Sequence, residues 1–590
     1  SEERLILAYG ATEAAAVMTR LDDLVAFLAA NPQLGVSLEI INVSDAPVID
    51  GLFDTWDGEP CSYEKANEVA GAITGLILDL EDTLPAGGAI KNVVLVGTDE
   101  MIPFFRQVDG SRDANASTLA GAFEPGSAGW GAALSETFLT NDGYGDRDPV
   151  PWIGDQLFVP EIAVGRLIET PADIIRSIDT CLDPATGCLL DPGTALSTGY
   201  DFLTDVGEAI ADVEDEIITP ALADRLISED WTATDFGNAV EAAPAFMSLN
   251  AHFSPDVALA ADLATTYTVT SFQGSGTDLF NGFVISVGCN AGLNLPDTTY
   301  GAGATRVDWS QAFAEQGASV WIGNTSYGIG HKDAIALTEL LNLLTVEGIA
   351  SGLSVGQAQW YAKQVYFSQL GLYSVYDYKA MQEMSLYGLP WMRLGTPSGT
   401  IDLPGPPRVT STASPAFGGV DSTTLTFDVA FDDVVLEDDV DPTDPLDPDN
   451  RGTYKSVAAT SEVTEAGSGL VTALDEANAP QVTANRPIVP KTTVDVTMPG
   501  WTAKGAVLRS LSTFDEPGFD PVVARMMTDL SGNEFEPGLA GNPFPDVFLN
   551  VTDYVAPDGS PGQNLAIIPG QFFEAEDGTG VMRTFTGFDV

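Results

Sequence analysis

The sequence is poor in four features that carry much protein chemistry: thiols, imidazoles, basic side chains and long apolar runs. Its 590 residues include four cysteines, two histidines, and 24 Lys and Arg against 85 Asp and Glu, a formal net charge of −61. A surface of that sign repels nucleic acid and anionic lipid, so we expect neither as a partner. No apolar run approaches the length of a membrane span, so we expect none of those either.

The common catalytic motifs are missing as well. The sequence contains no GxxxxGK[ST], no HExxH, no CxxC pair, and no GxSxG placed after a strand. The scattered thiols make a Cys/His zinc site a poor hypothesis, and nothing indicates an organic cofactor. A mechanism that uses imidazole at neutral pH has only His252 or His331 available.

The pattern of apolar segments predicts three regions of the chain: 1–185, 186–400 and 401–590. In the first part, apolar segments at 4–10, 36–43, 90–97 and 159–167 are predicted strands, and residues 13–30, 63–82 and 171–184 are predicted helices. The second part repeats this alternation, which is typical of an α/β fold with a parallel sheet covered on both faces. Its predicted strands are "GTALSTGYD", "APAFMSLNAHF", "GFVISVGCNAG" and "GASVWIGNTSYG", with helices at 206–219, 332–346 and 354–370.

Beyond residue 400 the helical periodicity fades, and alternating apolar and polar residues predict an all-β, sandwich-like domain. Within it, the Asp/Pro run 437–452 is interpreted as an exposed loop. The alternative is a calcium site, since carboxylate oxygens suit that ion. Its ligands would be Asp441, Asp444, Asp447 and Asp449.

Cys181 and Cys188 are seven residues apart across a Pro-Gly loop. This spacing suits a small disulfide, which would indicate an oxidising compartment, and two unrelated thiols are the alternative. The chain opens with charged residues and no signal peptide, which predicts a cytosolic protein or one whose leader has been removed.

The strongest hypothesis for chemistry concerns Cys289 and His252. Each follows an apolar strand, 37 residues apart, and ligands of open α/β sheets sit beyond the carboxyl ends of the strands. A thiol beside an imidazole suits nucleophilic acyl transfer. The alternatives are a cysteine that acts as a small buried apolar residue and a structural histidine.

Several segments between 90 and 395 resemble the caspase-like cysteine peptidases of clan CD, and most closely the gingipain-like family. They are "VVLVGTDEMIP", "NDGYGDRDPVP" with "VPEIAVGRL", "ISVGCNAGLN", "VWIGNTSYGIG" and "LYGLPWMRLG". The resemblance implies a caspase-like, two-subdomain parallel-sheet catalytic region followed by an immunoglobulin-like β-sandwich. It departs from the family at Phe253, where a glycine is usual, and at Leu389, where an aspartate is frequent.

The resemblance implies a secreted or cell-surface cysteine endopeptidase that cuts protein or peptide substrates after Arg or Lys. Cys289 would be the nucleophile and His252 the general acid/base. The backbone N–H groups of Cys289 and Phe253 would form the oxyanion hole. The implied substrate-binding residues are Asp201, Asp205, Asn324 and Tyr327, and the implied ligands of a structural Ca²⁺ are Asp142, Asp146 and Asp148. The departures leave open an altered specificity or a lapsed active site. Two alternative functions remain: an inactive extracellular binding or surface protein, which Phe253 favours, and a calcium-binding adhesion module with the α/β part as spacer.

Overall fold

The computed structural model describes the chain except for residues 86–87, 113, 192, 218–222, 302–306, 332–333, 396–401, 410–413, 418–419, 437–451, 467, 475–479, 525, 528–542 and 575–578. The Asp/Pro run with Asp441, Asp444, Asp447 and Asp449 lies outside the described residues. The chain divides into two compact units, which we call the α/β unit and the β unit. The α/β unit comprises 1–330, 337–363 and 375–403, and the β unit comprises 331–336, 364–374 and 404–590.

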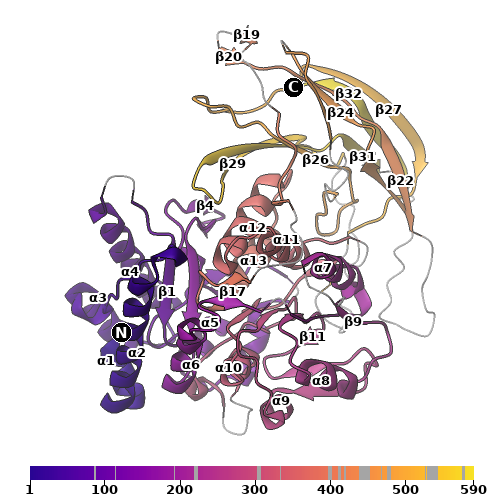
Figure 1. Ribbon diagram of the computed structural model, residues 1–590. Helices are drawn as coiled ribbons and strands as arrows, with labels where there is room; N and C mark the ends of the chain where they lie inside the picture. The colour runs from indigo at the N-terminus through magenta and orange to yellow at the C-terminus, as the bar shows by residue number, and fades with distance from the viewer. Residues whose placement is uncertain are drawn as a thin grey trace. The chain divides into compact units, whose positions relative to one another are not determined.

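The α/β unit, drawn from indigo to light orange in Figure 1, is built on one eight-stranded sheet in the order β1-β6-β17-β15-β14-β10-β8-β9. Two parallel blocks make up this sheet, and they meet where β17 runs antiparallel to β15. The predicted α/β class is therefore confirmed, with a mixed sheet. The strands are β1 (Asn92–Val96), β6 (Ala163–Leu167), β8 (Ala195–Gly199), β9 (Asp224–Ile227), β10 (Phe246–Ser248), β14 (Phe283–Ile285), β15 (Val320–Asn324) and β17 (Met384–Gly388).

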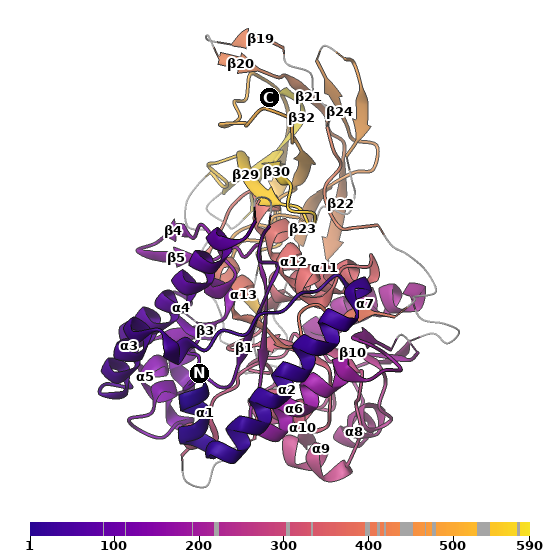
Figure 2. The same ribbon diagram turned by 60° about the vertical axis from the view of Figure 1, so that its left-hand side comes forward.

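The strand order changes direction between β8 and β10. The chain goes from β8 outward to β9, then returns past β8 to β10, β14 and β15. Because such crossovers are right-handed, the helices of the two directions cover opposite faces of the sheet. Helix α7 (Thr204–Ile217) packs on β8 and contacts α11 (Thr338–Ala350). Helix α10 (Trp309–Glu315) packs on β15 and contacts α6 (Pro171–Leu182) and α9 (Val269–Ser275). Figure 2 shows α2, α6 and α10 following one another along one face.

The six predicted helices correspond to α2, α4, α6, α7, α11 and α12, and α11 begins six residues later than predicted. Amphipathic spacing puts an apolar stripe on the sheet, and side-chain caps fix several N-termini: Thr170 caps α6 and Asp308 caps α10. The helices are α1 (Glu2–Tyr9), α2 (Ala11–Ala30), α3 (Pro47–Asp57), α4 (Tyr63–Thr83), α5 (Ala128–Leu134), α6 (Pro171–Leu182), α7 (Thr204–Ile217), α8 (Ala233–Glu241), α9 (Val269–Ser275), α10 (Trp309–Glu315), α11 (Thr338–Ala350), α12 (Val355–Gln369) and α13 (Val375–Glu383).

Two predicted N-terminal strands are wrong. Residues 4–9 lie in helix α1 and Gly10 is its C-cap; Ser1 accepts a hydrogen bond from the Arg4 N–H, and Leu5 is the buried residue. Residues 36–43 form no strand, and the sheet begins at β1. A short apolar run does not distinguish a buried strand from a helix. In α1 the run is not buried as a whole, since Leu7 is 76% exposed.

Two sheets of the β unit share its main core. One has the order β25-β24-β21-β32-β27 with β31 also paired to β32, and the other has the order β26-β30-β29. Their inner residues share one core, which includes Phe427 and Val463 from the first sheet and Val494 and Ile567 from the second. This is the predicted β-sandwich arrangement. The strands are β21 (Leu425–Asp428), β24 (Glu462–Glu465), β25 (Val471–Ala473), β26 (Thr492–Asp495), β27 (Ser510–Phe519), β29 (Leu549–Val555), β30 (Pro561–Ile567), β31 (Gly570–Glu574) and β32 (Gly580–Asp589).

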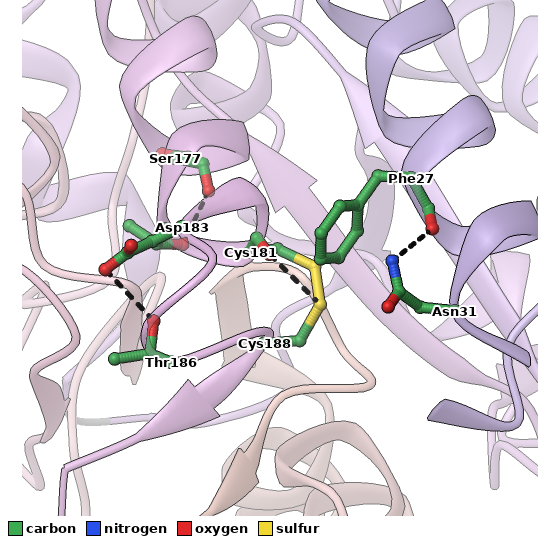
Figure 3. Close-up of a disulfide and its surroundings, with 8 residues drawn as sticks. Phe27, Asn31, Ser177, Cys181, Asp183, Thr186 and Cys188 are labelled. Atoms are coloured by element: carbon green, nitrogen blue, oxygen red, sulfur yellow. Dashed lines mark hydrogen bonds between the residues drawn. A yellow bond between two sulfur atoms is a disulfide. The ribbon is translucent and has the colours of Figure 1, made fainter. Parts of the chain in front are cut away.

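Cys181 and Cys188 form a disulfide that joins the end of α6 to the loop after it (Figure 3). Phe27 of α2 lies beside the two sulfur atoms, and both cysteines are buried. The remaining two cysteines, Cys61 and Cys289, are free thiols. Among the described residues, no helix is both long and apolar enough to span a membrane.

Candidate active site

Four of the predicted site residues follow four consecutive strands at one edge of the sheet. Strands β15, β14, β10 and β8 are mutually parallel neighbours, so their carboxyl ends share that edge. They lead respectively to Tyr327, Cys289, His252 and Asp201. This edge includes the point between β8 and β10 where the strand order reverses, which is where open α/β sheets bind ligands.

His252 and Cys289 occupy equivalent positions. Strand β10 pairs directly with β14, with Ser248 opposite Ile285 at their last residues. His252 and Cys289 each lie four residues beyond those partners. The loops that follow the two strands also touch each other. The Phe253 ring packs on Gly288, where an added Cβ would lie 2.3 Å from Cδ2 of Phe253. The residue after the histidine therefore touches the residue before the cysteine.

Hydrogen bonds to neighbouring strands hold the loop that carries Cys289. The Ser286 hydroxyl donates to the Leu249 carbonyl at 2.7 Å and accepts from the Gly288 N–H at 3.0 Å. The Asn324 amide donates to the carbonyls of Val287 at 2.8 Å and Gly288 at 3.3 Å. The predicted substrate residue Asn324 is thus fully buried beneath this loop, where its described contacts fix the backbone on which Cys289 stands.

The cysteine and the histidine are both largely enclosed. Cys289 is 6% exposed and His252 is 8% exposed. The Cys289 thiol donates to the Gly328 carbonyl with an Sγ···O distance of 3.6 Å. Phe253, the residue that departs from the family pattern, is 7% exposed and packs edge-on against Trp309 at a centroid distance of 5.2 Å. Its ring therefore belongs to the core.

The imidazole of His252 is oriented by an aspartate and two aromatic rings. Its Nε2 lies 3.2 Å from Oδ2 of Asp201, a residue predicted to bind substrate. The rings of Tyr200 and Phe202 lie edge-on to it at 5.2 and 5.6 Å. Because a carboxylate only accepts, Nε2 carries the proton and Nδ1 is left as the basic nitrogen.

Tyr200 supports the histidine segment and was missed from the sequence. Its hydroxyl accepts the His252 backbone N–H at 3.2 Å and donates to the Leu259 carbonyl at 2.8 Å. Burial raises the pKa of Tyr200, and nearby acidic groups, Cys289 among them, add to the increase. The signal available in the sequence was its position directly before Asp201 at the end of a predicted strand.

The other histidine is not suited to proton transfer. His331 is fully buried, and that burial lowers its pKa to about 4, so the ring is neutral at pH 7 and a poor base. Of the two imidazoles in the sequence, His252 is therefore the one placed for acid/base chemistry.

Two further predicted substrate residues are only partly buried. Tyr327 shares a hydrogen bond with the Thr118 hydroxyl at 2.6 Å, and the Lys379 ammonium lies 5.5 Å from the centre of its ring. Asp205 lies in the first turn of α7, where its carboxylate accepts the Val206 N–H at 2.7 Å.

The predicted calcium ligands separate into two places. Asp142 is buried and bonds through both oxygens to the Lys363 ammonium at 2.7 Å. Asp146 and Asp148 instead gather with Glu161, with one oxygen from each carboxylate within 4.8 Å of the others. Glu161 stands in the "VPEIAVGRL" segment and was missed. Burial raises the pKa of Asp146 to about 7 and of Glu161 to about 8.

Known proteins similar to this chain are found among solved structures. No family model matches the chain, and no curated protein matches it. Among solved structures, it is similar to the complex of the pro- and mature domains of RgpB from Porphyromonas gingivalis, with 11% identity and a TM-score of 0.41, covering 77% of this chain and 97% of that one. It is similar to the Arg-specific cysteine proteinase gingipain R (RgpB), with 12% identity and a TM-score of 0.41, covering 77% and 95%. A third match is a structure described as a protease, with 13% identity and a TM-score of 0.35, covering 68% and 87%.

Proposed function

We propose that this chain is a cysteine endopeptidase that hydrolyses peptide bonds through a thioester acyl-enzyme. One observation carries the proposal. His252 and Cys289 stand four residues beyond register-paired, neighbouring parallel strands, at the reversal of strand order. That placement brings a thiol and an imidazole to the position where this class of sheet binds ligands.

In the proposed reaction, Nδ1 of His252 accepts the Cys289 thiol proton, and the thiolate attacks the peptide carbonyl carbon. The tetrahedral intermediate collapses as the imidazolium protonates the departing amine, which leaves a thioester on Cys289. Water, deprotonated by the same imidazole, then attacks the thioester and releases the acid and the thiol. Asp201 acts here as a positioning residue, because its contact with Nε2 fixes the ring and its tautomer.

The oxyanion would be stabilised by the backbone N–H groups of Cys289 and Phe253. Any non-proline residue supplies an N–H, and the Phe253 ring is accommodated because Gly288 has no Cβ to collide with it. Phe253 and Gly288 therefore form a matched pair in this chain.

Three finer features belong to the same proposal. Cleavage after Arg or Lys would need a carboxylate near the cleft; Asp201 is already engaged by His252, so Asp205 would supply it. Extracellular location is supported by the Cys181–Cys188 disulfide. A structural Ca²⁺ fits the three carboxylates of Asp146, Asp148 and Glu161, whose mutual repulsion the ion would relieve.

The calcium part has its own test. We expect EDTA to lower the Tm of wild type and added CaCl₂ to restore it, with no response in the variant Asp148→Asn. The matched control Asp155→Asn removes one acidic charge outside the cluster and should keep the response. A Tm that is unchanged by EDTA would contradict the assignment.

The peptidase proposal is tested by labelling and turnover. An irreversible peptidyl chloromethyl ketone with Arg or Lys at P1 should alkylate wild type at Cys289 and leave Cys289→Ala unlabelled. The matched control is Cys61→Ala, because Cys61 is the other free thiol and should be dispensable. A positional-scanning fluorogenic peptide library, with calcium and reductant, should show turnover in wild type and in Cys61→Ala. No turnover and no alkylation at Cys289 would refute the proposal.

A second candidate function is favoured by the burial of the pair. With Cys289 6% and His252 8% exposed, the chain fits an extracellular binding or surface protein that keeps the scaffold without catalysis. The same library separates the two, because a binding protein would give no turnover and would respond to Cys289→Ala only through stability.

A further inference from the structure

The β unit contains a cavity of about 400 Å³ that the peptidase proposal does not use. Its floor comes from both sheets: Leu425 of β21 from one, and Val551 of β29 and Leu565 of β30 from the other. Leu425 and Leu565 are core residues, 5% and 3% exposed. Protein interiors rarely leave voids much larger than a water molecule, whereas small-molecule sites typically occupy about 300–1,000 Å³. The size is that of a ligand site.

The outer wall of the cavity is the connection between β26 and β27. Residues 496–509 have no regular secondary structure, and most of this segment lines the cavity. The small residues Ala503, Gly505 and Ala506 leave the space unfilled. Trp501 is 49% exposed and Val507 is 60% exposed on the same segment. The wall therefore offers apolar surface to the cavity and to its mouth.

The charge of the lining is opposite to that of the whole chain. Lys504 and Arg509 line the cavity, and none of its described lining residues is Asp or Glu; Asp589, next to the lining residue Val590, interacts electrostatically with Arg509 from outside the lining. The sequence as a whole has 85 acidic residues against 24 basic ones. The Arg509 guanidinium donates to the Thr424 hydroxyl at 2.8 Å, which holds it beside the cavity. Two basic side chains and no carboxylate in the described lining favour an anionic group in the cavity.

We propose that this cavity binds an amphipathic carboxylate, that is, a molecule with an apolar chain or ring and one carboxylate at its end. The apolar part lies between the sheets on Leu425, Val551 and Leu565, where it replaces water against core side chains. The carboxylate lies at the mouth and accepts hydrogen bonds from Lys504 and Arg509. This site is independent of the proposed peptidase function, since every residue in it belongs to the β unit.

The test is isothermal titration calorimetry of the full chain with decanoate. We expect saturable one-to-one binding, with decyltrimethylammonium at least about tenfold weaker and decanol intermediate. Lys504→Gln and Arg509→Gln should each weaken decanoate binding about fivefold, and Lys504→Glu should weaken it further. The matched control Lys65→Gln removes a cation from α4 and should leave the Kd unchanged.

A second variant tests the cavity. Ala506→Phe fills the space and should reduce affinity at least about tenfold, whereas Ala473→Phe, at an exposed position of β25, should not. Lys504 is exposed, so its variants keep the test valid if Ala506→Phe fails to fold. Absence of decanoate binding, equal binding of the cationic probe, or unchanged affinity in Ala506→Phe would each overturn the proposal. If an extended peptide bound at this cavity and decanoate showed no binding there, the proposal would be overturned in favour of a polypeptide ligand.

Discussion

The contact between Phe253 and Gly288 allows a quantitative test of the site, because it joins the histidine segment to the cysteine loop. In Gly288→Ala the new Cβ would lie 2.3, 2.7 and 2.9 Å from Cδ2, Cγ and Cβ of Phe253. Real Cβ atoms do not approach that closely, so the ring or the loop must move. Overpacking of this kind costs about 1–3 kcal/mol of unfolding free energy.

The substitution Phe253→Ala, on the other side of this contact, leaves a cavity. Phe253 is 7% exposed and packs on Trp309, so Phe253→Ala should cost about 3–5 kcal/mol. If the two residues were independent, the double variant would lose the sum, about 4–8 kcal/mol by the same two estimates. In the structure, the methyl group introduced by Gly288→Ala would occupy space vacated by the ring. The double variant should therefore be about 1–3 kcal/mol more stable than the sum.

The assay is urea unfolding followed by circular dichroism, with the four proteins of the cycle compared at one temperature. Gly71→Ala is the matched control, since a Cβ on that helical glycine meets nothing within 4 Å. It should be neutral or stabilising by up to about 1 kcal/mol. Additive losses in the cycle would refute the contact, and with it the juxtaposition of His252 and Cys289.

Three further outcomes follow from buried groups. Asp142→Ala should destabilise the protein by about 3–5 kcal/mol in thermal or urea unfolding, because it leaves the buried Lys363 ammonium unpaired; a loss under about 1 kcal/mol would contradict the pairing. Replacing Cys181 and Cys188 together by serine should cost about 2–3 kcal/mol by the loop-entropy estimate, and wild type in strong reductant should match that variant. Burial lowers the pKa of His331 from 6.5 to about 4, so its contribution to the free energy of unfolding should be complete above pH 6.5 and decrease as the pH falls toward 4. In His331→Gln the free energy of unfolding should depend less on pH across this range. An unchanged pH dependence would contradict the assignment of a neutral, buried His331.

Features that depend on local pattern could be predicted from the sequence. The apolar residues of 245–247 and 283–285 predict the buried strands β10 and β14, because such runs gain stability only when both faces are covered. The shortage of histidine and free thiols then limited the acyl-transfer hypothesis to Cys289 and His252. The change to alternating patterns after residue 400 predicted the sandwich because each of its sheets buries one face and exposes the other.

Features that depend on which neighbour a group meets could be read only from the folded chain. Residues 4–9 are as apolar as a strand but lie in α1, where Leu5 is buried and Leu7 stays exposed. The Asp201 carboxylate lies beside the His252 ring, and the Asn324 amide donates to the backbone of the Cys289 loop. The carboxylate that lies near Asp146 and Asp148 is that of Glu161, and the one predicted there was that of Asp142. Each outcome is set by contacts between segments that are distant in the sequence. Their geometry follows from strand order and packing, which no local pattern encodes.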